Sequence, residues 1–275
     1  EAPLTGVSNL VSSTGVVASD VSAVATARMY IGACEYGNDK AIFGFGETGA
    51  GEVGMTNLVS NTGVIASDVT AVGTARRAPA ACTYGGNKGI FGYGDDGSVV
   101  SMSNLVSSSG VVASDVTGVG TARRQLGAAE YSSNKDKGIF GYGITSSPVS
   151  MTNLVSNVGV VASDTTGVGT ARYGLAACGY GGDKAIFGFG TTGSVTGVTN
   201  LISNTGVAAT DTAAVGTART NLAATQYGSD KGIFAYGTTG SLTAVSNLVS
   251  NAGVVATDVT GVGTVRERPG ACSFN

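Results

Sequence analysis

The chain has 275 residues, a net charge of −3, 42% hydrophobic residues and only 12% charged residues. This composition excludes a disordered chain and a coiled coil. No stretch is rich in Lys or Arg, which argues against nucleic-acid binding because such binding depends on neutralising phosphates. No apolar run approaches the roughly 20 residues of a membrane-spanning helix. We therefore expect neither a nucleic-acid partner nor a membrane partner.

A short Asn-Leu block recurs along the whole chain. Its Asn returns every 47 to 49 residues, at Asn9, Asn57, Asn104, Asn153, Asn200 and Asn247. This period is too long for one coil of a β-helix and matches the roughly 40–50 residues of a propeller blade. The repeat units run over about 7–54, 55–101, 102–150, 151–197, 198–244 and 245–275. We expect residues 1–275 to form a single domain.

The fifth unit shows the elements that each repeat is expected to form. Runs of β-branched and aromatic residues, separated by Gly-containing turns, predict strands at 198–202, 207–211, 218–227 and 231–236. No helical periodicity extends across these turns. Four strands in two hairpins per repeat predict an all-β fold, a six-bladed β-propeller of four-stranded antiparallel blades.

The fourth of these strands carries a Lys-Ala/Gly-Ile-Phe pattern that occurs only five times, at 40–46, 88–94, 137–143, 184–190 and 231–237. Glycine within a strand indicates close backbone approach, so we expect this strand to be the innermost, with a bulge as the alternative. The sixth copy ends at Asn275 before this strand, and the chain begins just beyond it. One blade is therefore predicted to lack a strand, unless a partner or a lost segment supplies it. We expect a monomer, with association through the exposed edge as the alternative.

One hairpin supports a resemblance to known propellers. Residues 175–178 and 183–190 combine a small-residue strand, a turn and a strand ending in aromatic-Gly. This pattern resembles the blade hairpin of kelch-like and chromosome-condensation-regulator-like propellers, although the His-Thr and Trp of the latter family are absent. The whole unit is similar to tandem repeats in uncharacterised phage-encoded proteins, over essentially the full chain. The resemblance implies a propeller fold and a place in or on a viral particle, and it implies no activity.

Two charged residues recur in all six copies. They are Asp20, Asp68, Asp115, Asp164, Asp211 and Asp258, and eight residues later Arg28, Arg76, Arg123, Arg172, Arg219 and Arg266. A short Asp side chain can hydrogen-bond the backbone of a turn, and Arg can join strands or blades through charge-assisted hydrogen bonds. The alternative is a ring of carboxylates that holds a cation. Sixfold recurrence favours the structural interpretation, because a catalytic site needs one constellation of different groups.

The other recurring residues have similar pairs of interpretations. The Asn of each block is expected to satisfy backbone groups at a blade edge, with ligand recognition as the alternative. In five copies a Lys follows a turn and begins a strand. We expect its side chain to be solvated, with binding of anionic sugars as the alternative. These residues are Lys40, Lys88, Lys137, Lys184 and Lys231.

Four cysteines occupy the same repeat position: Cys34, Cys82, Cys178 and Cys272. Equivalent positions lie a repeat apart, too far for a disulfide. We expect buried free thiols, with a disulfide as the alternative, and synthesis in a reducing compartment such as the cytoplasm.

The copies differ at a few positions, where specific function could lie. Copy three carries the insertion 132–136, copy one has Glu47 and Glu52, and copy two has Asp95-Asp96. The most variable residues follow the recurring Arg: Met29-Tyr30, Arg77, Arg124-Gln125, Tyr173, Thr220-Asn221 and Glu267-Arg268. Variable loops on a regular scaffold often carry binding groups, and they also drift neutrally.

The absence of histidine excludes Ser-His-Asp and Cys-His catalysis and all histidine metal sites. We expect no catalytic residue, no metal and no cofactor, and we assign no specific binding residue. The leading hypothesis is a non-enzymatic propeller scaffold or binding module with a protein or glycan ligand. The alternative is a multivalent carbohydrate-binding propeller with one weak site per blade.

Overall fold

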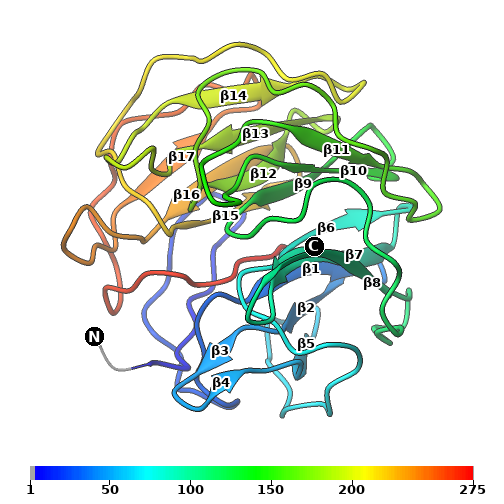
Figure 1. Cartoon of the computed structure of the whole chain (residues 1–275). Helices are drawn as coiled ribbons and strands as arrows, with labels where there is room; N and C mark the ends of the chain where they lie inside the picture. Colours follow the sequence, from blue (N-terminus) through cyan, green and yellow to red (C-terminus); the bar gives the residue numbers. More distant parts are fainter. Residues whose placement is uncertain (1–3, 275) are drawn as a thin grey trace.

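The computed structural model describes residues 4–274, and this part of the chain is all-β (Figure 1). Its strands form five three-stranded antiparallel sheets and one two-stranded hairpin. The described residues include no helix long and apolar enough to cross a membrane. The fold is a repeating, propeller-like arrangement of small sheets, as the period predicted.

The five three-stranded sheets share one strand order, in which the middle strand lies between the first and the third. The strands are β1 (Gly32–Tyr36), β2 (Lys40–Gly44) and β5 (Thr56–Val59); β6 (Ala80–Tyr84), β7 (Lys88–Asp95) and β8 (Val99–Val106); β9 (Gly127–Tyr131), β10 (Lys137–Gly141) and β11 (Thr152–Val155); β12 (Ala176–Tyr180), β13 (Lys184–Gly188) and β14 (Thr199–Ile202); β15 (Ala223–Tyr227), β16 (Lys231–Ala235) and β17 (Ser246–Val249). The hairpin of β3 (Glu47–Thr48) and β4 (Gly51–Glu52) extends from the first repeat.

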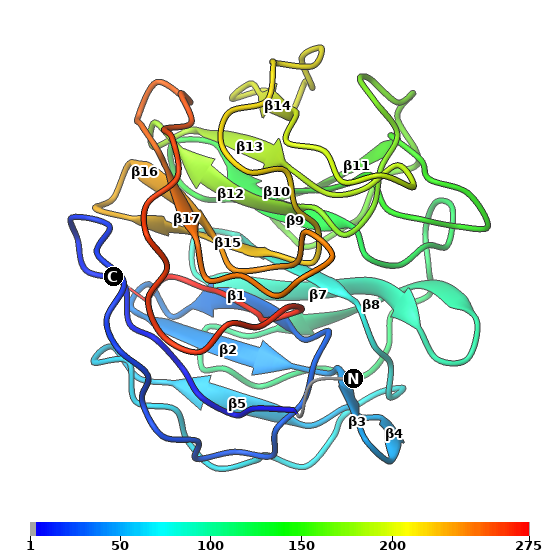
Figure 2. The same cartoon turned by 90° about the vertical axis from the view of Figure 1, so that its left-hand side faces the viewer.

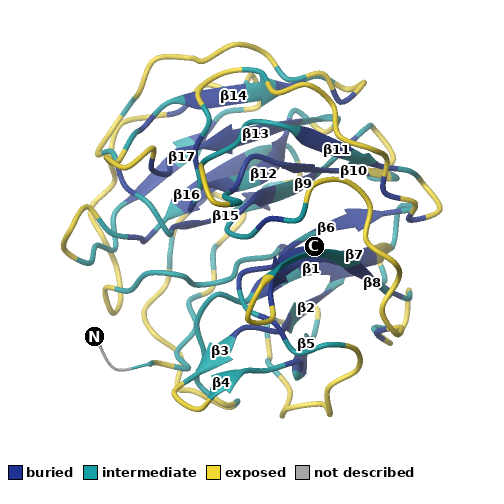
Figure 3. Cartoon of the chain, in the orientation of Figure 1, coloured by how far each residue is buried: buried dark blue, intermediate teal, exposed yellow. Residues whose placement is uncertain are grey.

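The hydrophobic core lies between successive sheets. Phe45, just after β2, meets Phe91 of β7 with ring centroids 5.1 Å apart in an edge-to-face arrangement, a geometry that aromatic pairs prefer. An equivalent aromatic pair lies at each of the three following contacts between sheets, with ring centroids 5.1 to 5.4 Å apart. Figure 3 shows buried strands surrounded by exposed connecting loops. Each sheet is therefore stabilised by its neighbours.

The predicted second strand of each repeat does not form a strand. In the fifth repeat, 207–211 contributes only the isolated bridge Ile202↔Ala208, and a second bridge, Thr199↔Thr212, follows directly after it. Val207 is 64% exposed, so this outer segment buries little that would hold it straight. The structure thus shows three strands per sheet where the sequence predicted four. The predicted strand 218–227 is likewise shortened to β15.

The prediction that the Lys-Ile-Phe strand is innermost is wrong. It is the middle strand of each sheet, whereas the first strands β1, β6, β9, β12 and β15 contact one another in chain order around a common centre. In Figure 2, β1 and β15 lie nearer the middle of the molecule than the third strands β5 and β14. The requirement for glycine in the middle strand has a different physical reason. A Cβ added at Gly44 would lie 2.8 Å from Cζ of Phe91, so this glycine admits the aromatic ring of the next sheet.

Six backbone hydrogen bonds form a cycle around the centre. Each joins the N–H of one repeat to the carbonyl of the preceding repeat, with N···O distances of 2.7 to 3.3 Å. The members, one from each repeat, all have φ between 51° and 61°: Tyr30, Ala78, Gln125, Gly174, Asn221 and Arg268. The bond from Tyr30 to the carbonyl of Arg268 joins the first repeat to the last. We call these six the ring residues.

The sixth repeat is assembled from both ends of the chain. Segment 8–11 makes the bridges Ser8↔Val21 and Val11↔Val17, which match those of the third strands elsewhere. Segment 270–274 corresponds to a first strand. No middle strand lies between these two segments among the described residues, in line with the predicted five copies. Glu1–Pro3 and Asn275, which entered the sequence alignment of this repeat, lie outside the described residues.

Candidate functional site

The recurring Asp, Arg and Asn form one hydrogen-bonded unit per repeat, which we call the clasp. At the sheet of β9, β10 and β11, Arg123 of the third repeat donates from Nε to the carbonyl of Tyr142 at 2.8 Å and from Nη2 to Oδ1 of Asn153, of the fourth repeat, at 2.6 Å. Asn153 donates to Asp164 at 2.9 Å, and Asp164 accepts from the N–H of Thr121 at 3.0 Å. The clasp therefore ties together the segments before and after each sheet.

The arginine of the clasp also joins neighbouring sheets. The guanidinium carbon of Arg123 lies 4.3 Å from the ring centroid of Tyr93, which belongs to the preceding repeat. Arg76, Arg123, Arg172 and Arg219 are fully buried. Burial lowers the pKa of Arg76 to about 10, opposed by the charge of Asp115. A buried guanidinium needs such partners, because an unpaired buried charge is costly.

The carboxylates of the clasps do not gather into a metal site. Burial by itself would raise the pKa of Asp164, but hydrogen bonds from Thr121 and Asn153 hold that pKa below its usual value. Each of the six Asp residues receives donors from the corresponding Thr and Asn. The described residues contain no group of three or more Cys, Asp or Glu that could hold a metal ion. The arrangement favours the structural interpretation of the recurring Asp and Arg.

The sixth clasp joins the two ends of the described chain. Thr264 donates its N–H to Oδ2 of Asp20 at 2.9 Å, and Asn9 donates to Oδ1 of Asp20 at 2.8 Å. Arg266 donates to Asn9. The contacts of Thr264 and Arg266 join residues more than 240 positions apart in the sequence, and they have the same partners as in the internal clasps.

The cysteines are free, as predicted, but only three are buried. Cys34, Cys82 and Cys178 pack against glycines of the next sheet; a Cβ at Gly89 would lie 2.5 Å from Sγ of Cys34. Burial raises the pKa of each thiol. Cys272 is only partly buried, which corrects the expectation, because it borders a groove between the two chain ends.

The recurring lysines begin the middle strands and lie at the surface. In three repeats the Lys pairs with the preceding Asp, which also accepts a hydrogen bond from a turn Asn at 3.2 Å. The three groups are Asp39-Lys40 with Asn61, Asp183-Lys184 with Asn204, and Asp230-Lys231 with Asn251. The lysine side chains are 41–43% exposed, so these groups could meet a ligand.

A polar cluster that the sequence reasoning missed lies at the centre of the fold. Lys135, from the insertion of copy three, donates to Oε2 of Glu35 at 3.1 Å. Burial first, and the charge of Glu35 second, raise the pKa of Glu130 to about 7. A Cβ at Gly179 would lie 2.1 Å from Nε2 of Gln226 and 2.8 Å from Oε1 of Glu130. Strand alternation could have indicated these residues, since they lie between the core Cys and Tyr positions.

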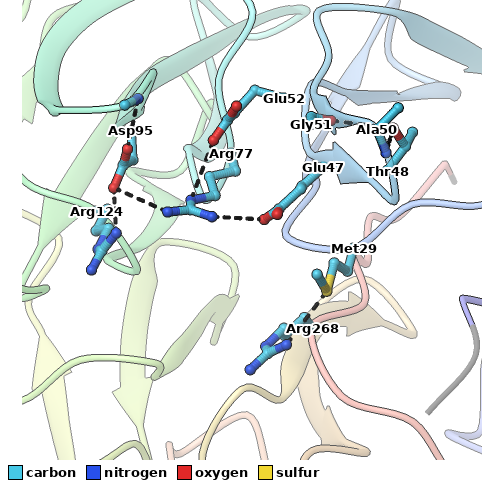
Figure 4. Close-up of polar contacts among 11 residues, drawn as sticks. Met29, Glu47, Thr48, Ala50, Gly51, Glu52, Arg77, Asp95, Arg124 and Arg268 are labelled. Carbon is cyan, nitrogen blue, oxygen red and sulfur yellow. Dashed lines mark hydrogen bonds and ion pairs between the residues drawn. The ribbon is translucent and has the colours of Figure 1, made fainter. Parts of the chain in front are cut away.

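The residues that vary most converge around the ring residues, at one end of the common centre. Figure 4 shows Arg77 between three carboxylates, with Nη1 3.0 Å from Glu47, Nε 3.7 Å from Glu52 and Nη2 3.8 Å from Asp95. Arg124 pairs with Asp95. The first three repeats therefore contribute an ionic network.

Neutral and mixed groups from the first, third, fifth and sixth repeats lie at the same end, and Tyr173 of the fourth repeat directly precedes the ring residue Gly174. Gln125 donates to Asn221 at 3.2 Å, and Asn221 donates to Glu267 at 2.8 Å. The guanidinium of Arg268 lies 4.4 Å from the ring centroid of Tyr30 and donates to the sulfur of Met29 at 3.4 Å. We call the variable side chains at this end the ring face. It is the candidate binding surface, because here the repeats differ from one another.

No protein-family model matches the chain, and no curated protein is found to match it.

Proposed function

We propose that the chain is a closed six-bladed propeller that acts as a non-enzymatic scaffold or binding module. Two features support closure: the cycle of ring-residue hydrogen bonds, and the sixth clasp between Asn9, Asp20 and Arg266. In this interpretation the outer segments with isolated bridges, such as 207–211, stand for the fourth strand of each blade.

One observation carries the functional proposal. The recurring Arg, Asn and Asp are engaged in clasps, whereas the side chains that differ between repeats gather on the ring face. A rigid scaffold that presents variable groups at one end is a common arrangement for binding. The lack of histidine supports a non-enzymatic role. The resemblance to phage-encoded repeats supports a place in or on a viral particle.

The test is a selection of ligands from a random peptide library against the wild-type chain. Binders are then compared on a double variant, Arg124→Ala with Tyr173→Ala, and on a control variant, Val160→Ala, at an exposed position away from the ring face. We expect binding to be lost in the double variant and kept in the control. Binders that retain full affinity for the double variant would contradict the ring face as the binding surface.

A carbohydrate-binding propeller is the second candidate, favoured by the three exposed Asp-Lys-Asn groups. A glycan array separates the two. Binding that weakens in steps when Asn61, Asn204 and Asn251 are replaced by Ala would favour the multivalent lectin. Glycan binding that is absent, or unaffected by these changes, would favour the ring face.

A further inference from the structure

A groove of about 590 Å³ lies between the C-terminal segment 270–274 and the N-terminal segment 7–11. Its walls include residues of the first and fifth repeats as well, among them Arg28, Phe43 and Ala235. It occupies the position that a middle strand occupies in each three-stranded sheet. We call it the acceptor groove.

The two sides of the acceptor groove are held where the outer strands of a sheet belong. A Cβ added at Gly63 would lie 2.5 Å from Cδ2 of Leu10 and 3.0 Å from Cζ of Phe274. In every three-stranded sheet the equivalent glycine meets the Tyr of the first strand and the Leu of the third strand, as Gly110 does. Leu10 and Phe274 thus repeat a spacing that elsewhere encloses one strand, so the groove has the width of a strand.

Arg266 presents a hydrogen-bond donor to this groove. In five repeats the clasp Arg donates from Nε to the carbonyl of the aromatic residue after the middle strand, as Arg172 does to Phe189 at 2.8 Å. Arg266 donates from Nη1 and Nη2 to Thr264 and Asn9, and its Nε makes no hydrogen bond to another described residue. An extended chain in the groove would supply the corresponding carbonyl.

Arg28 lines the same groove, with 4% of its side chain exposed. The other five clasp arginines each lie over an aromatic ring of the preceding repeat, 3.8 to 4.3 Å from its centroid. Arg28 has no such ring among the described residues and lines the groove. Phe43 is also only partly buried, whereas Phe91, Phe140 and Phe187 at equivalent positions are fully buried. An aromatic side chain in the groove would cover the exposed part of Phe43, next to Arg28, where the other repeats place a ring over the clasp Arg.

Ala235 limits the size of the side chain that can lie beside it in the groove. The fifth residue of four middle strands is a glycine, where a Cβ would lie 2.7 to 3.1 Å from the Phe of the next sheet: Gly44, Gly92, Gly141 and Gly188. At the fifth sheet this position is Ala235, which carries that Cβ and faces the groove. A Phe at the corresponding place in the groove would meet the methyl group. A smaller apolar residue such as Leu would fit.

We propose that the acceptor groove binds an extended segment of another polypeptide that resembles the repeat's own middle strand. The segment would add to the edges of 7–11 and 270–274 by main-chain hydrogen bonds, with side chains in the adjoining pockets. Its pattern is Lys-Ala-Ile-Leu-Gly-Phe-Gly, in which the Phe covers Phe43 next to Arg28 and the Leu lies beside Ala235. The proposal goes beyond the ring face and does not depend on it.

The test uses the whole 275-residue chain and two synthetic peptides. The phenylalanine peptide, Gly-Asp-Lys-Ala-Ile-Phe-Gly-Phe-Gly, has the sequence of residues 182–190. The leucine peptide replaces its first Phe by Leu. Fluorescence anisotropy should show that the wild-type chain binds the leucine peptide about tenfold more tightly, and that Ala235→Gly reverses the preference. Replacing the second Phe of either peptide by Ala should weaken binding about tenfold.

Two controls locate the binding. A chain extended after Asn275 by the leucine sequence, Gly-Asp-Lys-Ala-Ile-Leu-Gly-Phe-Gly, should melt at a higher temperature and no longer bind the leucine peptide. The ring-face double variant Arg124→Ala with Tyr173→Ala should bind it as the wild type does. Binding no tighter than that of a scrambled peptide, a preference unchanged in Ala235→Gly, or undiminished binding by the extended chain would each overturn the proposal.

Discussion

The five three-stranded sheets and the sixth repeat use the same residues in different surroundings. In the sheets, the middle strand inserts its Phe between two neighbours, and aromatic pairs such as Phe189–Phe234 fill the space. At the sixth repeat the two outer segments keep their positions through the clasp of Asn9 and Arg266, while a groove separates them. The clasps and the ring-residue hydrogen bonds therefore keep the outer segments of each repeat in position, and the middle strands fill the core between them.

The largest expected change in stability comes from removing an aromatic side chain from the core. Phe140 is fully buried between two sheets, so Phe140→Ala should lower the free energy of unfolding by about 3–5 kcal/mol. Phe43→Ala removes the same atoms from the edge of the groove and should cost clearly less. Chemical denaturation of both variants measures the difference. Equal costs would contradict the view that the sixth repeat lacks a filled core.

The next effect tests the glycine at the end of the middle strand. Gly188→Ala puts a Cβ 2.7 Å from Cζ of Phe234 and should destabilise the chain by about 1–3 kcal/mol through overpacking. Ala235→Gly, the reverse change beside the groove, should cost at most about 1 kcal/mol, the conformational entropy of glycine. Thermal melting of the pair, compared with the wild type, decides the point.

A third effect tests the clasp and its pH dependence. Asp164→Ala should cost about 1–3 kcal/mol, towards the lower end because the carboxylate is 29% exposed. Hydrogen bonds keep the pKa of Asp164 below its unfolded value, so the stabilisation is present above the unfolded pKa and is lost as pH falls through the folded pKa. The difference in melting temperature between the variant and the wild type should therefore be constant from pH 7 to about pH 5 and should narrow as the pH falls below the unfolded value of 3.8. A constant gap would contradict this account.

The smallest effect concerns the central carboxyl of Glu130. Its pKa of about 7 is above the ordinary value for Glu, so folding is penalised increasingly as pH rises from about 4.5 to about 7, and the penalty is constant above that. Glu130→Gln should thus raise the melting temperature at pH 8 and change it little at pH 5. An equal gain in melting temperature at pH 5 and pH 8 would contradict this account.

The sequence alone determined the repeat. The period of the Asn residues, the Gly-containing turns and the β-branched runs predicted an all-β repeat fold, the limits of the middle and third strands, and the five-to-six mismatch of the copies. These features are local, because turn geometry and strand preference depend on neighbouring residues in the chain. Free cysteines followed from equivalent positions in the same way.

Only the tertiary structure decided how the repeats meet. Gly44 is glycine because Phe91 of the next sheet approaches it, which no pattern within one repeat could show. The outer segment, 207–211 in the fifth repeat, does not form a strand because its side chains bury too little surface. The first strand of each sheet, which is rich in small residues, lies at the centre. The cluster of Glu35, Glu130 and Lys135 depends on three segments far apart in sequence. Contacts between repeats depend on packing and desolvation across the whole fold. They cannot be predicted from the residue pattern within one repeat.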